Sequence, residues 1–209
     1  MFDAEKLRPV ADAAAVLDEG DYHANWDFAG TDFSAPGREL AGHIFENCRF
    51  SHCRFAEISL LASGFDSCRF LDSALLLVNL DNARLNGVDF TRCKLQGLSF
   101  ADCHTFGFSP SFRETVIDGC AFYGNSLKKR PFSGCQIRNT DFVGCDLRES
   151  DFTGGVFSGV NFRDCNLEKA DFRGARDYLI DPGNNRVRGA FFDLPEAQSF
   201  LMFLGIKLG

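Results

Sequence analysis

The sequence contains no apolar run that approaches the roughly 18 consecutive residues of a membrane-spanning helix. Its start also lacks the basic and then apolar pattern of a secretion signal, because acidic residues are scattered through the first thirty positions. These two absences predict a cytoplasmic protein that makes no contact with a membrane.

Residues arranged for catalysis or metal binding are also missing. The four histidines, His23, His43, His52 and His104, show neither a nucleophile partner nor the spacing of metal ligands. The chain has no concentrated basic patch with interleaved aromatic residues, which direct binding of nucleic acid would require. We therefore expect a protein that is not an enzyme, holds no cofactor or metal, and does not bind nucleic acid directly.

What the sequence does contain is a period of five residues. Every fifth residue from Leu40 to Phe100 is large and apolar, and a second run from Phe112 to Phe172 repeats the pattern after a shift of two residues. Neither a helix, with a period of about 3.6, nor a strand, with a period of about 2, produces this spacing. Such a repeat predicts a solenoid in which each coil rests on its neighbours.

The second run also indicates how many repeats make one coil, because residues twenty positions apart match. We therefore expect four sides per coil, with like residues stacked at about the 4.8 Å spacing of neighbouring strands. The clearest matching set is Phe112, Phe132, Phe152 and Phe172.

All nine cysteines lie two residues before a large apolar position. Small residues such as Ser63 share this slot, so we expect a narrow buried corner in which a thiol acts as a compact hydrophobe. Cys48 with Cys68, and Cys145 with Cys165, stack one coil apart and could approach disulfide distance. The odd number of cysteines and the missing secretion signal nevertheless predict reduced thiols.

Two insertions interrupt the period, near residues 34–39 and 104–111. We interpret the second as a short loop and a candidate contact with a partner, although one of its two phenylalanines could instead fold back onto the coil. The loop residues are Thr105, Phe106, Gly107 and Phe108. The expected divisions of the chain are an N-terminal cap (1–27), a repeat region (28–176) and a C-terminal segment (177–209).

Short stretches such as Thr140-Asp141-Phe142 and Cys145-Asp146-Leu147 resemble the unit of the pentapeptide-repeat proteins. The resemblance covers about residues 28 to 176. It implies an all-β fold, the right-handed quadrilateral β-helix of that family.

The sequence after the repeats, at 175–182 and 189–197, resembles the tail of the quinolone-resistance (Qnr) proteins and of the albicidin-resistance protein. This resemblance implies a homodimer joined through its C-terminal ends. It also implies that the protein imitates duplex DNA, binds DNA gyrase or topoisomerase IV, and protects the enzyme from inhibitors. The alternative is a general interaction module with an unknown partner, because a fold alone does not determine a function.

The tail also predicts a short α-helix from its own residues, over about 194–204. Asp193 and Glu196 have the spacing of a capping box, Pro195 fits a first turn, and Gly205 fits a helix stop. The helix would cap the open end of the coil, either alone or together with a role in dimer contact. The residues expected at a dimer interface are Leu194, Ala197, Phe200, Leu201, Phe203 and Leu204.

The net charge of −7 is unevenly distributed, and residues 140–181 hold nine acids and five bases. We expect this acidic block, next to the proposed dimer end, to face a basic DNA-binding surface of a topoisomerase. The alternative is that these acids only keep a hydrophobic rod soluble. The outward-facing members are Asp141, Asp146, Glu149, Asp151, Asp164, Glu168 and Asp171.

Overall fold

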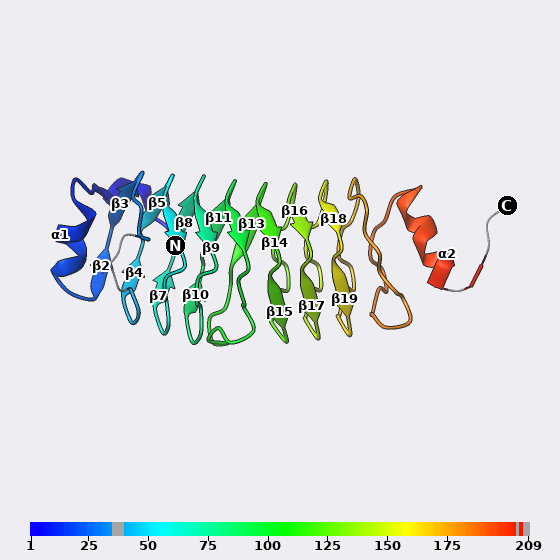
Figure 1. The fold of residues 1–209 in the computed structure, drawn as a ribbon. Coiled ribbons are helices and arrows are strands. Elements are labelled where there is room, and N and C mark those ends of the chain that lie inside the picture. The colour runs from blue at the N-terminus through cyan, green and yellow to red at the C-terminus, as the bar shows by residue number, and fades with distance from the viewer. Residues whose placement is uncertain (35–39, 204, 207–209) are drawn as a thin grey trace.

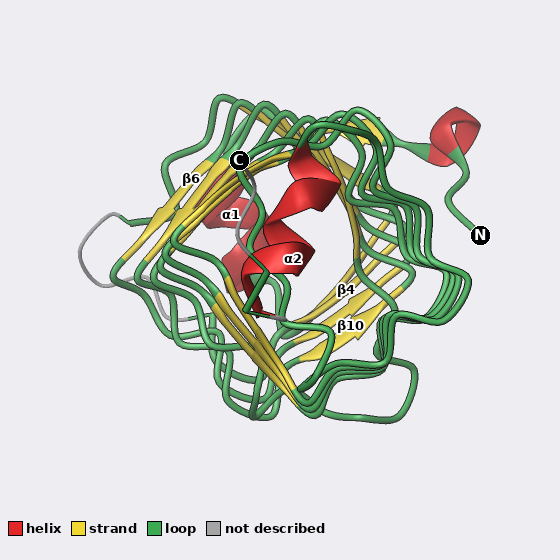
Figure 2. Ribbon diagram, turned by 90° about the vertical axis from the view of Figure 1, so that its right-hand side faces the viewer, coloured by secondary structure: helices red, strands yellow, loops and turns green. Residues whose placement is uncertain are grey.

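The computed structural model describes residues 1–34, 40–203 and 205–206, and it shows a rod of stacked parallel coils (Figure 1). Seen along the rod, the coils superimpose as a four-sided tube (Figure 2). The expected quadrilateral β-helix is therefore confirmed. Most of the insertion predicted at 34–39 lies outside the described residues. Across the described part of the chain, no helix is both long and apolar enough to cross a bilayer.

Strands one coil apart pair in parallel and form the walls of the rod. Wall A is a six-stranded sheet of β1 (Arg8–Pro9), β3 (Trp26–Ala29), β5 (Arg49–Ser51), β8 (Arg69–Leu71), β11 (Asp89–Thr91) and β13 (Ser111–Arg113). Wall C is a six-stranded sheet of β6 (Arg54–Ala56), β9 (Ala74–Leu76), β12 (Lys94–Gln96), β14 (Val116–Asp118), β16 (Gln136–Arg138) and β18 (Val156–Ser158).

The other two walls have shorter sheets that single bridges lengthen. Wall B contains β2 (Tyr22–Ala24), β4 (Ile44–Glu46), β7 (Gly64–Asp66) and β10 (Arg84–Asn86). Wall D contains β15 (Ala121–Tyr123), β17 (Asp141–Val143) and β19 (Asn161–Arg163). The bridges run through Pro131, Asp151 and Asp171 on wall A, through Ser126, Asp146, Asn166 and Arg186 on wall B, and through Ser59, Asn79 and Ser99 on wall D.

The five-residue period sets the register of each wall. Phe28, Phe50 and Phe70 pair in register on wall A, so each ring points into the core directly above the one before. Two residues after each such position the backbone takes a left-handed conformation, with φ 54° at His52 and 51° at Arg92. This residue turns the chain onto the next wall.

The core is built around a column of aromatic rings. Along wall A, nine phenylalanines stack with successive ring centroids between 4.7 and 5.5 Å apart, which marks eight turns of the coil. Burying each ring contributes roughly 1.5–3 kcal/mol, so this column is a main source of stability. The stacked residues are Phe28, Phe50, Phe70, Phe90, Phe112, Phe132, Phe152, Phe172 and Phe192.

The cysteines occupy the small inward slot that the sequence predicts, and all nine are buried and free. Most of their thiols donate a hydrogen bond to a main-chain carbonyl one coil earlier, as Cys93 Sγ does to Phe70 O at 3.3 Å. Ser63 and Ser150 make the same contact with Leu40 O and Leu127 O. The slot therefore accepts small side chains, Ala83 and Ala170 among them, and a thiol or hydroxyl there gains a main-chain hydrogen-bond partner.

The second insertion leaves wall B after His104 and returns at Ser109. The main-chain nitrogens of these two residues donate to Ala83 O and Leu85 O, which continues the ladder of the wall on both sides of the loop. Phe108 fills the core position between them and is only 8% exposed. Phe106 lies at the tip of the loop and is 87% exposed.

Helices cover both ends of the rod (Figure 1). At the N-terminal end, α1 (Ala13–Asp18) buries Ala13 and Leu17. The 3-10 turn before it, η1 (Ala4–Lys6), lies against the side of the rod, where Asp3 N donates to Asn47 Oδ1 at 2.6 Å. Asp12 caps α1 by accepting hydrogen bonds from the main-chain nitrogens of Ala14 and Ala15. With its buried face of Ala13 and Leu17, α1 covers the core at the N-terminal end of the rod.

The C-terminal helix is shorter than the predicted 194–204. A 3-10 turn, η2 (Glu196–Gln198), leads into α2 (Ser199–Phe203). The predicted capping box is wrong, because the Asp193 carboxylate accepts a hydrogen bond from Gly174 N at 2.7 Å and so belongs to the preceding coil. Gly205 does end the helix, with φ 71° and its nitrogen donating to Met202 O.

Candidate partner-binding surfaces

The structure distributes the seven predicted acidic residues over three walls instead of one surface. Asp151 and Asp171 lie on wall A, and Asp141 and Asp164 lie on or beside wall D. The remaining three, Asp146, Glu149 and Glu168, belong to wall B. A single acidic patch formed by all seven is therefore not present.

On wall A, Asp151 and Asp171 are direct neighbours in adjacent coils, as the twenty-residue period predicts. Each carboxylate is satisfied locally: Asp151 accepts from the nitrogen and hydroxyl of Thr153, and Asp171 accepts from the nitrogen and guanidinium of Arg173. The hydrogen bond from Arg173 lowers the pKa of Asp171. The repulsion between the stacked acids is thus offset by donors on the same coils.

On wall B, the predicted acids lie among bases. Arg148 holds Asp146 in an ion pair and lowers its pKa through a hydrogen bond, and Lys128 and Lys129 both lie within 3.5 Å of Glu149. The C-terminal half of this wall and its corner with wall A carry more bases than acids. Those bases are Lys128, Lys129, Arg148, Lys169, Arg186 and Arg188.

Wall D has a different character, because its carboxylates have no basic partner within the described residues. Asp141 accepts only from the amide of Asn161, at 3.0 Å. Asp81 and Asp102, which follow the core residues Leu80 and Phe100 of the same wall, are exposed and were not among the predicted residues. Sorting the acids by wall, instead of by position along the chain, could have found them.

The outward positions of wall D hold small and large side chains, and Leu61, Tyr123 and Arg163 are exposed there. The outward positions beside the aspartates include Ala101, Ala121, Gly124 and Gly144. At the corner toward wall B, Asp164 and Asp146 line a shallow pocket of about 270 Å³ together with Arg186. This wall therefore presents carboxylates on a mixed surface that also carries the base Arg163.

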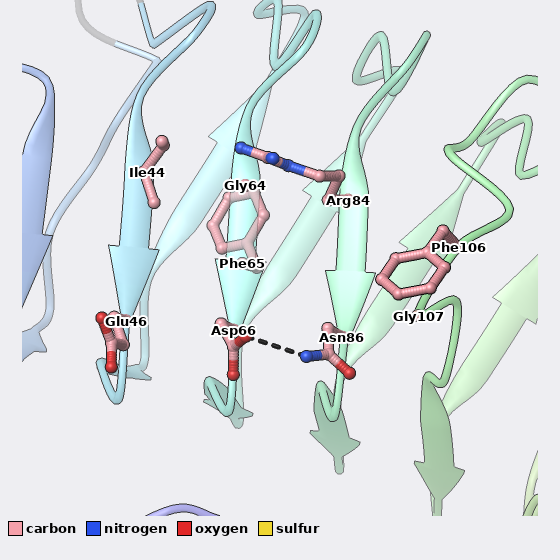
Figure 3. A pocket seen from close by; sticks show the side chains of 9 residues that line it. All are labelled: Ile44, Glu46, Gly64, Phe65, Asp66, Arg84, Asn86, Phe106 and Gly107. Atoms are coloured by element: carbon pink, nitrogen blue, oxygen red, sulfur yellow. Dashed lines mark hydrogen bonds between the residues drawn. The ribbon is translucent and has the colours of Figure 1, made fainter.

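Of the four predicted loop residues, three project from the rod. Thr105, Phe106 and Gly107 are exposed, but Phe108 is a core residue and cannot contact a partner. The prediction for Phe108 is wrong because the chain needs one large residue at this level of wall B. Phe106 and Gly107 line a pocket of about 300 Å³ on the same wall (Figure 3).

The C-terminal end presents an apolar surface. Phe200 turns inward and packs on Phe192, with ring centroids 4.7 Å apart, so it serves mainly to close the core. Leu194 and Met202 are 76% and 72% exposed, and Phe203 and Ile206 are also exposed. Ala197 and Leu201 are partly buried, and Leu204 lies outside the described residues. Met202 and Ile206 thus join the predicted interface residues.

The described residues hold no group of three or more His, Cys, Asp or Glu side chains placed to bind a metal ion. All nine thiols are buried and free, and Cys48 with Cys68, and Cys145 with Cys165, lie one coil apart within hydrogen-bond distance. Walls A, B and D, the inserted loop and the C-terminal end differ in charge and shape, which are the properties that govern recognition of a macromolecule.

Comparison with known proteins agrees with the repeat and the fold. Residues 43–122 match the family described as a pentapeptide repeat region, and residues 132–168 and 140–176 match pentapeptide repeats (8 copies). No curated protein matches the sequence. Among solved structures, QnrB1, a plasmid-mediated fluoroquinolone resistance protein, is 23% identical, with 90% of this chain and 89% of that chain covered and a TM-score of 0.54.

HetL, a pentapeptide repeat protein involved in heterocyst differentiation regulation from the cyanobacterium Nostoc, is 13% identical. That comparison covers 88% of this chain and 92% of HetL, with a TM-score of 0.43. The repeat matches together span more than half of the sequence, and the coil they describe is the coil that the structure contains. The chain is a member of the pentapeptide-repeat family.

Proposed function

We propose that this protein binds a type II topoisomerase, DNA gyrase or topoisomerase IV, in the place of duplex DNA and thereby protects the enzyme from inhibitors. The similarity in fold to a fluoroquinolone resistance protein supports this proposal. It is not sufficient alone, since a pentapeptide-repeat protein also takes part in the regulation of differentiation.

The observation that carries the proposal is the charge of wall D. Asp81, Asp102, Asp141 and Asp164 lie on wall D or at its corners, and none makes an ion pair with a described base. Arg163 on β19 is exposed on the same wall and leaves the acids in excess. Four coils separate the first of these acids from the last, which corresponds to roughly 19 Å at the strand spacing of about 4.8 Å. A DNA-binding surface is shaped and charged to accept such an excess of anions along a narrow rod.

The charges of wall A contrast with this arrangement. Asp72 pairs with Arg92 at 2.8 Å, and Asp89 lies within 4 Å of both Arg69 and Arg113. Such pairs neutralise one another and add little to a long-range field. An approaching basic protein would therefore be steered toward wall D.

We also propose that two copies associate through their C-terminal ends. The exposed apolar residues Leu194, Met202, Phe203 and Ile206 would be covered in such a dimer. Wall D of each copy would then continue toward the junction, because Asp164 lies close to that end of the coil. The dimer would offer a longer anionic rod than either copy alone.

The test is DNA supercoiling by purified gyrase in the presence of a fluoroquinolone, and then of albicidin, with this protein titrated in. We expect supercoiling to be restored. The double variant Asp141→Asn/Asp164→Asn should need at least a tenfold higher concentration for the same rescue, whereas Asp151→Asn/Asp171→Asn on wall A should rescue like the unmodified protein.

Equal rescue by both double variants would contradict the role of wall D but keep the protective function. No rescue by the unmodified protein, together with no inhibition of gyrase at any dose, would contradict the function itself. The protein would then be a general interaction module for a different partner.

A further inference from the structure

A trough on wall B lies on a different side of the rod from the aspartates of wall D. It has a volume of about 300 Å³ and crosses β4, β7 and β10 (Figure 3). Two rows of outward residues border it: Ile44, Gly64 and Arg84 form one row, and Glu46, Asp66 and Asn86 form the other. The inserted loop closes one end with Phe106 and Gly107.

Gly64 creates the hollow in the middle of the trough. Its φ is not in the left-handed region, so the backbone does not require glycine at this place. A Cβ atom built on Gly64 would lie 3.2 Å from Nη2 of Arg84 and 3.6 Å from Cγ1 of Ile44. The missing side chain therefore leaves room that the Arg84 side chain crosses (Figure 3).

The loop places an aromatic ring beside this hollow. Gly107 has φ 76°, and a Cβ atom there would lie 3.5 Å from Cγ of Asn86, so the loop passes close to β10. The ring of Phe106 stands next to Arg84 and Asn86 and is 87% exposed (Figure 3). At the other end of the wall, Tyr22 on β2 is a second exposed ring.

The charged groups of the trough have no partners of opposite sign within the described chain. Glu46 accepts a hydrogen bond from the Tyr22 hydroxyl, and Asp66 accepts one from Nδ2 of Asn86 at 2.8 Å. Neither carboxylate has a lysine or arginine within ion-pair distance among these residues, and Arg84 has no carboxylate within that distance. Asp66 also accepts from the Ser67 hydroxyl at 2.9 Å, and that hydroxyl accepts from the Met1 ammonium group at 3.2 Å. Among the groups that line the trough itself, two carboxylates and one guanidinium give a net negative charge.

We propose that this trough is a docking site for an arginine side chain of a partner protein. The guanidinium would stack on the Phe106 ring and donate to the Asp66 carboxylate, while its aliphatic stem would lie over Gly64. Glu46, two strands from β10, would contribute only through its charge. Arginine fits better than lysine because its planar head can both stack on a ring and donate to the two oxygens of one carboxylate. Arg84 can move aside without losing an ion pair, because it makes none.

This site does not depend on the proposed function, because it lies on another wall and uses other residues. The probe for a test is N-acetyl-arginine amide, with the neutral N-acetyl-citrulline amide as its matched control. Titration is followed by the amide signals of the ¹⁵N-labelled protein. We expect saturable shifts centred on the amides of Gly64, Asp66 and Gly107, with an affinity in the millimolar range.

Variants distinguish specific binding of the arginine probe in the trough from nonspecific attraction of a cation to exposed carboxylates. Asp66→Asn should weaken binding at least tenfold, Phe106→Ala several-fold, and Arg84→Ala should strengthen it several-fold by removing the like charge. Asp102→Asn on wall D, which also removes one exposed carboxylate, should leave the affinity unchanged. Equal shifts with the citrulline probe, or equal losses in Asp66→Asn and Asp102→Asn, would overturn the proposal.

Discussion

Nε2 of His23 lies 2.9 Å from Nδ1 of His43, and the two rings stack inside the N-terminal end of the core. His23 occupies a position that holds phenylalanine in the next two coils of wall B, and it is 2% exposed. Burial, and then the neighbouring His43, lower the pKa of His23 from 6.5 to about 4. The pair is therefore built around a neutral His23.

Acid should destabilise the protein through His23. The folded pKa lies below the unfolded one, so the contribution is fully present above pH 6.5 and is lost as the pH falls toward 4. The loss should reach about 3 kcal/mol at most. Urea unfolding at pH 7 and pH 4.5 measures it, and His23→Phe should remove much of the difference between the two values. An unchanged pH dependence in this variant would contradict the assignment.

The stacked column predicts a large difference between two phenylalanines. Phe132 is fully buried between Phe112 and Phe152, and Phe132→Ala should cost about 3–5 kcal/mol of unfolding free energy. Phe106→Ala should change it by less than about 0.5 kcal/mol, because that ring is exposed. Denaturant unfolding of both variants compares them, and a cost for Phe106→Ala near that of Phe132→Ala would contradict the exposed loop.

The nine thiols should be unreactive in the folded protein. Burial raises the pKa of Cys53, Cys93 and Cys120 to about 11, and that of Cys103 and Cys135 to about 12, so these five form little thiolate at pH 8. Hydrogen bonds with Cys68 and Cys145 lower the pKa of Cys48 and Cys165, so these two thiols are protected by their buried position. Ellman's reagent should therefore label none of them rapidly in buffer. In guanidinium chloride it should label all nine, since all are free. Fast labelling without denaturant would show that the coil opens locally.

The proposed dimer gives a fourth prediction. Met202→Glu/Phe203→Glu places two charges on exposed apolar positions and should produce a folded monomer whose unfolding midpoint no longer depends on protein concentration. Phe200→Ala is the matched comparison: it should lower stability by about 2–4 kcal/mol, because that ring packs on Phe192. Light scattering coupled to gel filtration measures both masses. A monomeric unmodified protein at micromolar concentration would rule out the interface.

Periodicity allowed the walls to be predicted, because one large residue in five must face the core and residues twenty apart must stack. The small slot of the cysteines followed from the same count. The placement of Phe108 could not be predicted, since two phenylalanines in a loop of changed length compete for one core position. Only the ladder contacts of His104 and Ser109 decide between them.

The errors in the C-terminal helix and the acidic patch have different causes. Asp193 has the local spacing of a cap, but its carboxylate is held by Gly174, nineteen positions earlier, and such a contact is invisible to a local pattern. The predicted acidic surface grouped the acids by their position in the sequence. In a four-sided coil, however, consecutive five-residue repeats lie on different walls. Asp141 and Asp151 consequently face different walls.

The column of rings passes the inserted loop without interruption. Phe90 and Phe112 are 22 positions apart instead of twenty, yet their rings still stack at 5.5 Å, in nearly parallel planes. Extra residues at this corner are thus absorbed outside the wall, and the coils beyond them keep their order. The rod is therefore a rigid scaffold for this loop. The sequence between Thr105 and Gly107 can be exchanged or lengthened, while the coils on either side of the loop keep their positions.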